Sequence, residues 1–347
     1  MFRSIYPGYR GSTDPTRIFR RALALVALTS ALTGCGGDQN ALDPKSHSEH
    51  AIAHLWWWLM IGCWIGFGVI CFLLLLGWLR RNREGLPFGG GERAGNLLVV
   101  LLGIALPIVL LSSLFFWSDI VVIRSTAAPT RGSTRLTVHV IGHQWWWEAR
   151  YPGMRAVTAN EIHIPVGVPV DVAGTTNDVI HSFWIPQLNR KIDLIPGRTN
   201  RVLLQANEPG IYEGECAEFC GLQHAHMVAT VIADPKPVFR AWLANMAKPV
   251  RAPSKPSEER GRGVFLEQGC AECHRLRGTP ANGDVGPDLT HLATRRKLAA
   301  GTVVNDYVHL AGWVADPQHF KPGNRMPQVP MSGDDFNALI DYLQSLK

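Results

Sequence analysis

Apolar residues form three runs without a charge in the first third of the chain, and beyond them apolar and polar residues alternate over short distances. The runs are Ala22–Leu32, Leu55–Leu79 and Leu97–Trp117. Each of the last two supplies the roughly 20 apolar residues that a helix needs to cross a hydrocarbon layer of about 30 Å. Tryptophans near their ends suit the two membrane interfaces. The pattern predicts a transmembrane hairpin with helices at 51–80 and 97–118.

The first apolar run has the form of a secretory signal. Arg17, Arg20 and Arg21 precede it, and it ends in small residues followed by Cys35. This arrangement resembles a bacterial lipoprotein signal, which would leave Cys35 as the acylated N-terminus. An ordinary signal peptide with an incidental cysteine is the alternative.

The loop between the two predicted spans sets the expected topology. It is rich in arginine: Arg80, Arg81, Arg83 and Arg93. The positive-inside preference places this loop in the cytoplasm and both flanking ends outside. We therefore expect a multi-pass protein of the bacterial inner membrane with its soluble domains on the periplasmic side. Cys63 and Cys71, inside the first span, are interpreted as apolar packing.

After Asp119 the chain changes to short β-rich runs separated by glycine, proline and asparagine. They include Leu136–Ile141, Glu161–Ile164, Val168–Val172 and Arg201–Leu204. Closely spaced strands with no helical segment between them predict an all-β sandwich or barrel over 119–240. Pro169 cannot donate to a sheet ladder, so the third run is predicted to be an edge strand.

The last part of the chain shows a helical pattern. Proline-rich sequence at Lys248–Pro256 predicts an extended linker, assigned to 241–256. Ser257 is expected to cap a helix with two glutamates in its first turn. Ser332 is expected to cap a terminal helix with one apolar stripe, formed by Phe336, Leu339, Ile340, Leu343 and Leu346. These features predict an all-α domain over 257–347.

Composition and charge exclude two other classes of protein. The formal net charge is +6, but five arginines and one aspartate place +4 of it in residues 1–34, which leaves +2 once the signal is removed. Nucleic-acid binding needs a basic face, so we expect none. The odd number of cysteines, seven, argues against a simple disulfide framework.

The segment Gly214–Met227 combines two thiols, an imidazole and a thioether. Soft sulfur and nitrogen donors suit copper, and two cysteines could bridge a pair of copper ions. His181, at an expected strand end, is the candidate for a second histidine. A Cys216–Cys220 disulfide, a structural zinc site and unrelated buried residues are the alternatives, although zinc has little use for a thioether.

The stretch Asp178–Met227, which includes Ile195–Arg198, resembles the copper-binding domain of cytochrome c oxidase subunit II. The resemblance implies a cupredoxin Greek-key barrel behind a transmembrane hairpin and a dinuclear copper A centre. The implied ligands are the side chains of His181, Cys216, Cys220, His224 and Met227, with the backbone carbonyl of Glu218. The family spacing selects His224 over His226. The resemblance also implies that the side chain of Glu218 binds a magnesium ion at the interface with subunit I.

Two further positions follow from the resemblance. Gly142–Trp147 resembles the aromatic segment beside the copper, whose first tryptophan, Trp145, is where electrons enter. Taken alone, three tryptophans are more typical of packing or of a membrane surface. Many family members place a glutamate of a proton path in the second span, where this chain has Val100. That part of the proton route is therefore expected to differ.

Cys270–His274 is a C-x-x-C-H motif, in which two thiols form thioethers with a haem and the histidine ligates its iron. The surrounding segment, 257–347, resembles class I cytochrome c. The implied haem c residues are Cys270, Cys273, His274 and Met326. Met331 is the alternative distal methionine, interpreted as core packing. Histidine and methionine ligation raises the haem potential, which suits a donor that feeds an oxidase.

The two resemblances imply the electron-input subunit of a cytochrome c oxidase. Haem c would take electrons from an external cytochrome c or a membrane donor and pass them through the copper pair to the oxygen-reducing site of subunit I. The alternatives are a nitrous-oxide reductase, which adds a propeller and lacks the hairpin, and a membrane-anchored electron carrier without an oxidase partner. The expected segments are 1–34 signal, 35–50 external segment, 51–80 first span, 81–96 cytoplasmic loop, 97–118 second span, 119–240 copper domain, 241–256 linker and 257–347 cytochrome domain.

The lipoprotein interpretation predicts the N-terminus of the mature chain. Intact-mass spectrometry of the purified protein should give a chain that begins at an acylated Cys35, because signal removal and acylation act on the same cysteine. Retention of Met1, or an unmodified N-terminus elsewhere, would contradict this interpretation.

Overall fold

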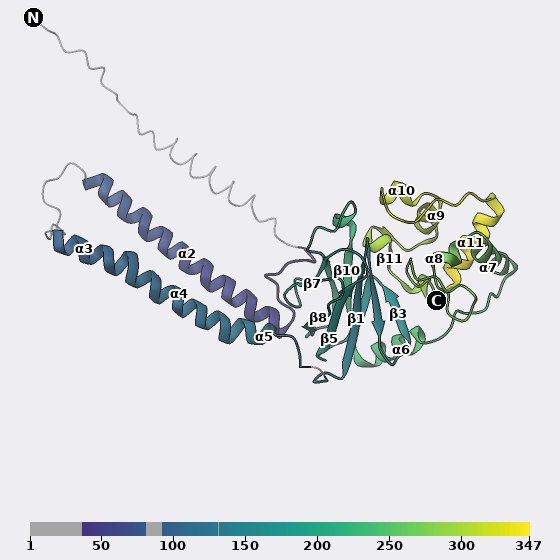
Figure 1. The fold of residues 1–347 in the computed structure, drawn as a ribbon, viewed down its shortest axis with the longest axis horizontal. Helices are drawn as coiled ribbons and strands as arrows, with labels where there is room; N and C mark the ends of the chain where they lie inside the picture. The colour runs from purple at the N-terminus through teal and green to yellow at the C-terminus, as the bar shows by residue number, and fades with distance from the viewer. Residues whose placement is uncertain (1–36, 81–91, 131) are drawn as a thin grey trace, which may run out of the picture.

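The structure is a computed structural model that describes residues 37–80, 92–130 and 132–347 (Figure 1). Its described parts are two long helices, a domain of β-strands and a C-terminal domain of short helices. The predicted signal, Cys35 and most of the arginine-rich loop lie outside the described residues.

Two helices of the described chain are long and apolar enough to cross a membrane. The first is α2 (His47–Arg80), and the second runs through α3 (Glu92–Val100), η1 (Leu101–Ala105), α4 (Leu106–Trp117), η2 (Ser118–Ile123) and α5 (Arg124–Thr126). They lie side by side and project from the β domain (Figure 1). Large apolar side chains such as Trp64 and Phe115 are exposed all around both helices. A helix that is apolar on every face suits lipid rather than water.

The β domain consists of two five-stranded sheets within the described residues. One has the order β3 (Ala156–Ala159), β2 (Trp146–Tyr151), β1 (Leu136–His143), β5 (Val170–Thr176) and β8 (Asn200–Leu204). The other has the order β4 (Glu161–Pro165), β10 (Val228–Asp234), β9 (Gly210–Cys216), β6 (His181–Trp184) and β7 (Ile192–Leu194). Buried valines, isoleucines and aromatic rings form one core. The predicted all-β sandwich or barrel is confirmed, because the two sheets enclose this core.

The prediction of an edge strand at Pro169 is wrong. β5 pairs with β1 in parallel and with β8 antiparallel, so it lies inside the sheet. The strand begins at Val170, and the proline ring lies before the first ladder position. Its missing N–H therefore costs no hydrogen bond in the ladder.

A helix that the sequence pattern did not reveal completes the β domain. α6 (Lys236–Met246) contributes Phe239 and Met246 to the core of this domain, past the boundary expected at residue 240. Trp242 of the same helix stacks on His163 at a ring distance of 4.0 Å. The segment that joins the two soluble domains is correspondingly shorter than predicted.

The C-terminal domain is mainly helical, as predicted. It contains α7 (Pro256–Glu267), α8 (Cys270–Cys273), η4 (Leu292–Thr294), η5 (Ala299–Gly301), α9 (Tyr307–Ala315), α10 (Pro317–Phe320) and α11 (Gly333–Ser345), with a short pair of strands, β11 (Lys297–Leu298) and β12 (Val303–Val304). Ser332 accepts a hydrogen bond from the N–H of Asp335 and caps α11 as predicted. The predicted cap at Ser257 is wrong, because α7 starts at Pro256 and its N-cap is Lys255, two residues before Ser257. The fixed φ of Pro256 suits a first helical position.

Gly261 allows α7 and α11 to cross in close contact. A Cβ atom added there would lie 2.0 Å from the backbone oxygen of Ala338. Gly263 lies in the same helix with open space around it. The crossing joins the first and last helices of the domain, so we expect the stability of the whole domain to depend on it.

We therefore predict opposite effects for two substitutions in α7. Gly261→Ala should lower the free energy of unfolding of the C-terminal domain by about 1–3 kcal/mol, because backbone atoms must move apart. Gly263→Ala should raise it by up to about 1 kcal/mol through helix propensity alone. Calorimetric melting of the full chain measures both, and equal melting temperatures for the two variants would contradict the close crossing.

Candidate copper and haem sites

The predicted copper ligands meet at one end of the β domain. His181 is the first residue of β6 and Cys216 is the last of β9, while Cys220, His224 and Met227 lie on the loop from β9 to β10. β9 and β10 pair antiparallel, and the N–H of Cys216 donates to the carbonyl of Met227 over 3.1 Å. The N–H of Ala217 donates to the carbonyl of Ser182 and ties this loop to β6. Strand pairing therefore brings distant residues to one place.

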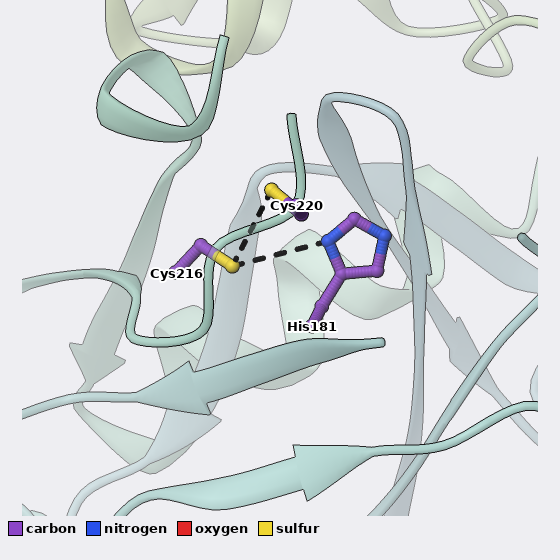
Figure 2. A group of neighbouring side chains, drawn as sticks. All are labelled: His181, Cys216 and Cys220. Atoms are coloured by element: carbon purple, nitrogen blue, oxygen red, sulfur yellow. Dashed lines mark hydrogen bonds between the residues drawn. The ribbon is translucent and has the colours of Figure 1, made fainter. Parts of the chain in front are cut away.

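The side chains of His181, Cys216 and Cys220 point toward one another (Figure 2). Cys216 Sγ is 3.8 Å from both Cys220 Sγ and His181 Nδ1, and the ligand atoms of these three buried residues lie within 4.8 Å of one another. Cys220 Sγ is 3.6 Å from His224 Nδ1 and 3.8 Å from Met227 Sδ. The carbonyl of Glu218 lies 3.2 Å from Cys216 Sγ.

The chemistry of this donor set fits a copper pair. Two thiolates, two imidazoles, a thioether and a carbonyl converge, and soft donors of this kind select copper. His226 lies apart from them, with its Nδ1 2.8 Å from Gln223 Oε1. The Glu218 side chain is exposed, so its carbonyl and not its carboxylate faces the thiols.

Asp178 orients one of the histidines. His181 Nε2–H donates to Asp178 over 2.8 Å, which leaves Nδ1 directed toward Cys216. Burial would raise the pKa of Asp178, but hydrogen bonds from His181 and from the N–H groups of Gln144 and Val179 outweigh it and lower the pKa to about 2. A carboxylate that holds the far nitrogen of a ligand histidine fixes its ring and its tautomer.

The two buried thiols lie close enough to shift each other's pKa. The contact with Cys220, opposed by burial and supported by His181, lowers the pKa of Cys216. The same contact and burial raise the pKa of Cys220. A cation at the site would favour the thiolate form of both cysteines, because metal ligation requires thiolates.

Two tryptophans contact the ligand loop from the turn and strand that follow β1. Trp145 Nε1–H donates to the carbonyl of Cys220 over 3.0 Å, and Trp147 Nε1–H donates to the carbonyl of Met227 over 3.3 Å. Trp147 is fully buried beside His181, whereas Trp145 retains 9% of its exposure. The expected point for electrons to enter therefore touches the backbone of a candidate copper ligand.

A cavity of about 450 Å³ lies next to the C-x-x-C-H motif. Its size falls within the roughly 300–1,000 Å³ typical of cofactor pockets. Many of its lining residues are apolar, including Phe265, Leu289, Leu292, Leu298, Leu310, Trp313, Leu339 and Leu343. Cys270, Cys273, His274 and Met326 also line it. Met331 instead packs against the hydrophobic core of the domain.

Three features of the cavity fit a haem. His274 Nδ1–H donates to the carbonyl of Pro287 over 2.8 Å, which leaves Nε2 for a metal. Gly286 makes room for this ring, because a Cβ there would lie 2.5 Å from His274 Cε1. Arg295 lines the cavity, and its buried Nε has no hydrogen-bond partner in the described chain. A haem propionate would satisfy that buried cation.

The β domain forms part of the wall of this cavity. His143, Gln144, Trp145, Trp146 and Asn160 of the β domain line it together with the C-terminal residues. The rings of His143 and Trp146 stack at 4.3 Å. His143, Gln144, Trp145 and Trp146 belong to the aromatic segment that the sequence indicated, although only Trp145 was given a role there; Asn160 was not predicted.

The fold and the two sites define a class: an electron-transfer protein with apolar helices, a cupredoxin-like copper domain and a cytochrome domain. The family description "Cytochrome C oxidase subunit II, periplasmic domain" matches residues 154–233, and "Cytochrome c" matches residues 258–347. A cytochrome c oxidase subunit 2 from Alkalihalophilus pseudofirmus is 34% identical over 339 residues, which cover 94% of this chain and 97% of the relative. The chain therefore belongs to the cytochrome c oxidase subunit II family.

Other oxidase subunits are similar to this chain. A cytochrome c oxidase subunit 2 from Bacillus subtilis is 27% identical over 95% of this chain and 98% of its own length. The crystal structure of the periplasmic domain of subunit II of cytochrome oxidase from Bradyrhizobium japonicum is 31% identical over 34% of this chain and 94% of that one, with a TM-score of 0.32. The chain is thus a membrane protein and an oxidase subunit, and the family implies a copper A centre and a haem.

Gly142 offers a test of the copper ligands. A Cβ there would lie 2.8 Å from Cδ2 of the fully buried His181. Gly142→Ala should therefore displace the ring and weaken copper binding by about 10–100-fold, in the range seen when support for a ligand is lost. Titration of the metal-free chain with copper measures this change.

The control is Gly174→Ala, whose Cβ would crowd Leu194 and Ile192 at 3.1 and 3.2 Å in the same core without touching a ligand. It should bind copper nearly as the unmodified chain does. Equal losses in both variants would show that core packing, and not His181, governs copper binding.

Proposed function

We propose that this chain receives electrons for a haem-copper oxidase through a covalent haem c and a dinuclear copper centre that lie in series. The observation that carries the proposal is the shared cavity: the C-x-x-C-H domain and the aromatic segment beside the copper ligands line it together. When bound, the haem iron and the copper pair supply one-electron redox centres.

The residues proposed for the copper pair are the side chains of His181, Cys216, Cys220, His224 and Met227, with the carbonyl of Glu218. Their convergence and the separate hydrogen bonding of His226 support this set. The side chain of Glu218 is exposed, and we propose that it binds magnesium where subunit I covers it.

For the haem we propose thioether links to Cys270 and Cys273, with His274 and Met326 as iron ligands. The position of Met326 on the cavity wall and the packing of Met331 in the core support this choice. Trp145 is the proposed point where electrons reach the copper domain, because its indole lies between the cavity and the carbonyl of Cys220.

The proposed setting is the bacterial inner membrane, with the hairpin in the bilayer, an acylated Cys35 and both soluble domains on the periplasmic side. Subunit I is the proposed acceptor, and an external cytochrome c or a membrane-bound donor is the proposed source of electrons. The exposed apolar surfaces of α2 and α4 provide area for packing against lipid and subunit I.

Replacing both thiolates tests the order of the two centres. In a Cys216→Ser, Cys220→Ser variant, copper content should fall from about two per covalent haem to background, because the bridging ligands are gone. Haem c should still be attached and reduced by the external donor, while oxygen consumption by the assembled oxidase should fall to background.

The matched control is Cys63→Ser, Cys71→Ser, which removes two free thiols from α2 and leaves both sites intact. Stopped-flow absorbance follows the haem and copper bands separately, and an oxygen electrode follows turnover. Near-normal oxygen consumption in a chain shown to lack copper would mean that electrons bypass the site.

A further inference from the structure

A lysine of the cytochrome domain is buried where the two soluble domains meet. Lys321 follows α10 and is 3% exposed. Its ammonium group donates to the carbonyl of Trp145 over 3.0 Å and to the carbonyl of His226 over 2.8 Å. Trp145 lies between β1 and β2, and His226 immediately precedes the candidate ligand Met227. One side chain therefore joins the cytochrome domain to two separate segments around the copper site.

Burial of this cation is costly, and two carbonyl oxygens compensate only part of the cost. Burial lowers the pKa of Lys321 to about 8, and the nearby Cys220 sulfur opposes the shift. The group is therefore mainly charged at neutral pH. A buried charge of this kind is a poor source of stability, so the geometry that it fixes is the better explanation for its position.

The residues after Lys321 lie against the loop that carries the candidate copper ligands. Gln223 Nε2 donates to the carbonyl of Pro322 over 2.8 Å, and Gly323 packs so close to Leu222 that a Cβ would lie 2.7 Å from its Cδ1. Arg325 donates to Gln144 Oε1 over 2.9 Å.

Gln144 in turn donates through Nε2 to the carbonyl of Cys220 over 2.9 Å. A chain of hydrogen bonds thus leads from Cys220 through Gln144 to Arg325. Met326, the next residue, lines the haem cavity.

We propose that Lys321 is a positioning residue for electron transfer between the two domains. It holds the segment 321–326, and with it the Met326 side of the haem cavity, against Trp145 and the copper-ligand loop. The inference rests on the proposed function, since it assigns the residue that sets the distance between the two proposed centres.

Further contacts between the domains lie away from the copper loop and would persist without Lys321. Glu161 accepts hydrogen bonds from the backbone of Arg296 and Lys297, and Lys297 forms an ion pair with Glu213 over 2.6 Å. Arg277 donates to the carbonyl of Met246 beside the linker. Loss of Lys321 should therefore loosen the segment over the copper site while the cytochrome domain stays attached.

The test is Lys321→Met in the full chain, loaded with haem and copper and purified in detergent. Hydrogen–deuterium exchange in the segments 142–147 and 221–227 should become at least about tenfold faster, because a charge-assisted contact at their surface is lost. Haem-to-copper electron transfer should slow by about tenfold or more, as expected for displaced partners. The haem and copper spectra should not change.

Two further variants complete the comparison. Glu213→Gln removes an interdomain ion pair that is partly exposed, and exchange in both segments should stay within about twofold of the unmodified chain. Lys321→Arg keeps the charge and the donors, so it should restore part of the protection and of the rate. If Lys321→Met does not fold, Lys321→Gln replaces it, with the same two segments as readout.

Unchanged exchange in both segments for a folded Lys321 variant would overturn the proposal. Loss of the copper or haem spectrum with unchanged exchange would also overturn it, since Lys321 would then serve a cofactor site directly. If the unmodified chain transfers no electrons from haem to copper, the proposed function fails. The exchange comparison still decides whether Lys321 docks the domain.

Discussion

The antiparallel pairing of β9 with β10 is the constraint on which the copper-ligand loop, and the docking of the cytochrome domain against that loop, depend. It closes the loop that carries Cys220, His224 and Met227, and it returns Met227 to within one hydrogen bond of Cys216. The two indole N–H groups of Trp145 and Trp147 bind carbonyls of the same loop. A loop held at its ends and along its length keeps its donors in a fixed arrangement before any metal binds, which reduces the ordering that binding would otherwise require.

The cytochrome domain uses this rigid loop as its docking surface. The segment after α10 contacts both the copper-ligand loop and the turn that carries Trp145. A displacement of either domain would therefore change the distance between the copper ligands and the haem cavity. A short linker also keeps the two domains at a high effective concentration, so no diffusional encounter separates them. The arrangement gives a fixed relation between the copper-ligand loop and the haem cavity in place of a transient complex.

Buried charge marks both sites. Arg295 in the haem cavity and Lys321 at the domain junction are cations with little solvent, and Asp178 is a carboxylate held by His181. Burial of the two cations costs free energy, whereas the hydrogen bonds to Asp178 favour its charged form. Departures from a fully satisfied interior are expected at functional sites, and here they surround the cavity and the ligand loop.

The sequence by itself determined the features that depend on short-range patterns. The apolar runs define the two long helices, and β-rich runs mark β1, β4, β5 and β8. Ser332 caps α11, and the C-x-x-C-H and copper-loop motifs carry their donors within a few residues. Local rules failed at Pro169 and Ser257, because each depends on the exact residue at which an element starts. Pro169 lies just before its strand, so its missing N–H breaks no ladder hydrogen bond. Ser257 lies inside its helix, so its side chain does not cap the helix.

Only the tertiary structure decided which residues from separate segments meet. His181 joins the thiols through the pairing of β6 with β9, and Lys321 reaches Trp145 through the docking of two domains. Periodicity records which face of an element is buried but not which other element covers it. The contacts between the haem cavity and the copper loop depend on that long-range packing, and for this reason they could not be predicted from the order of residues alone.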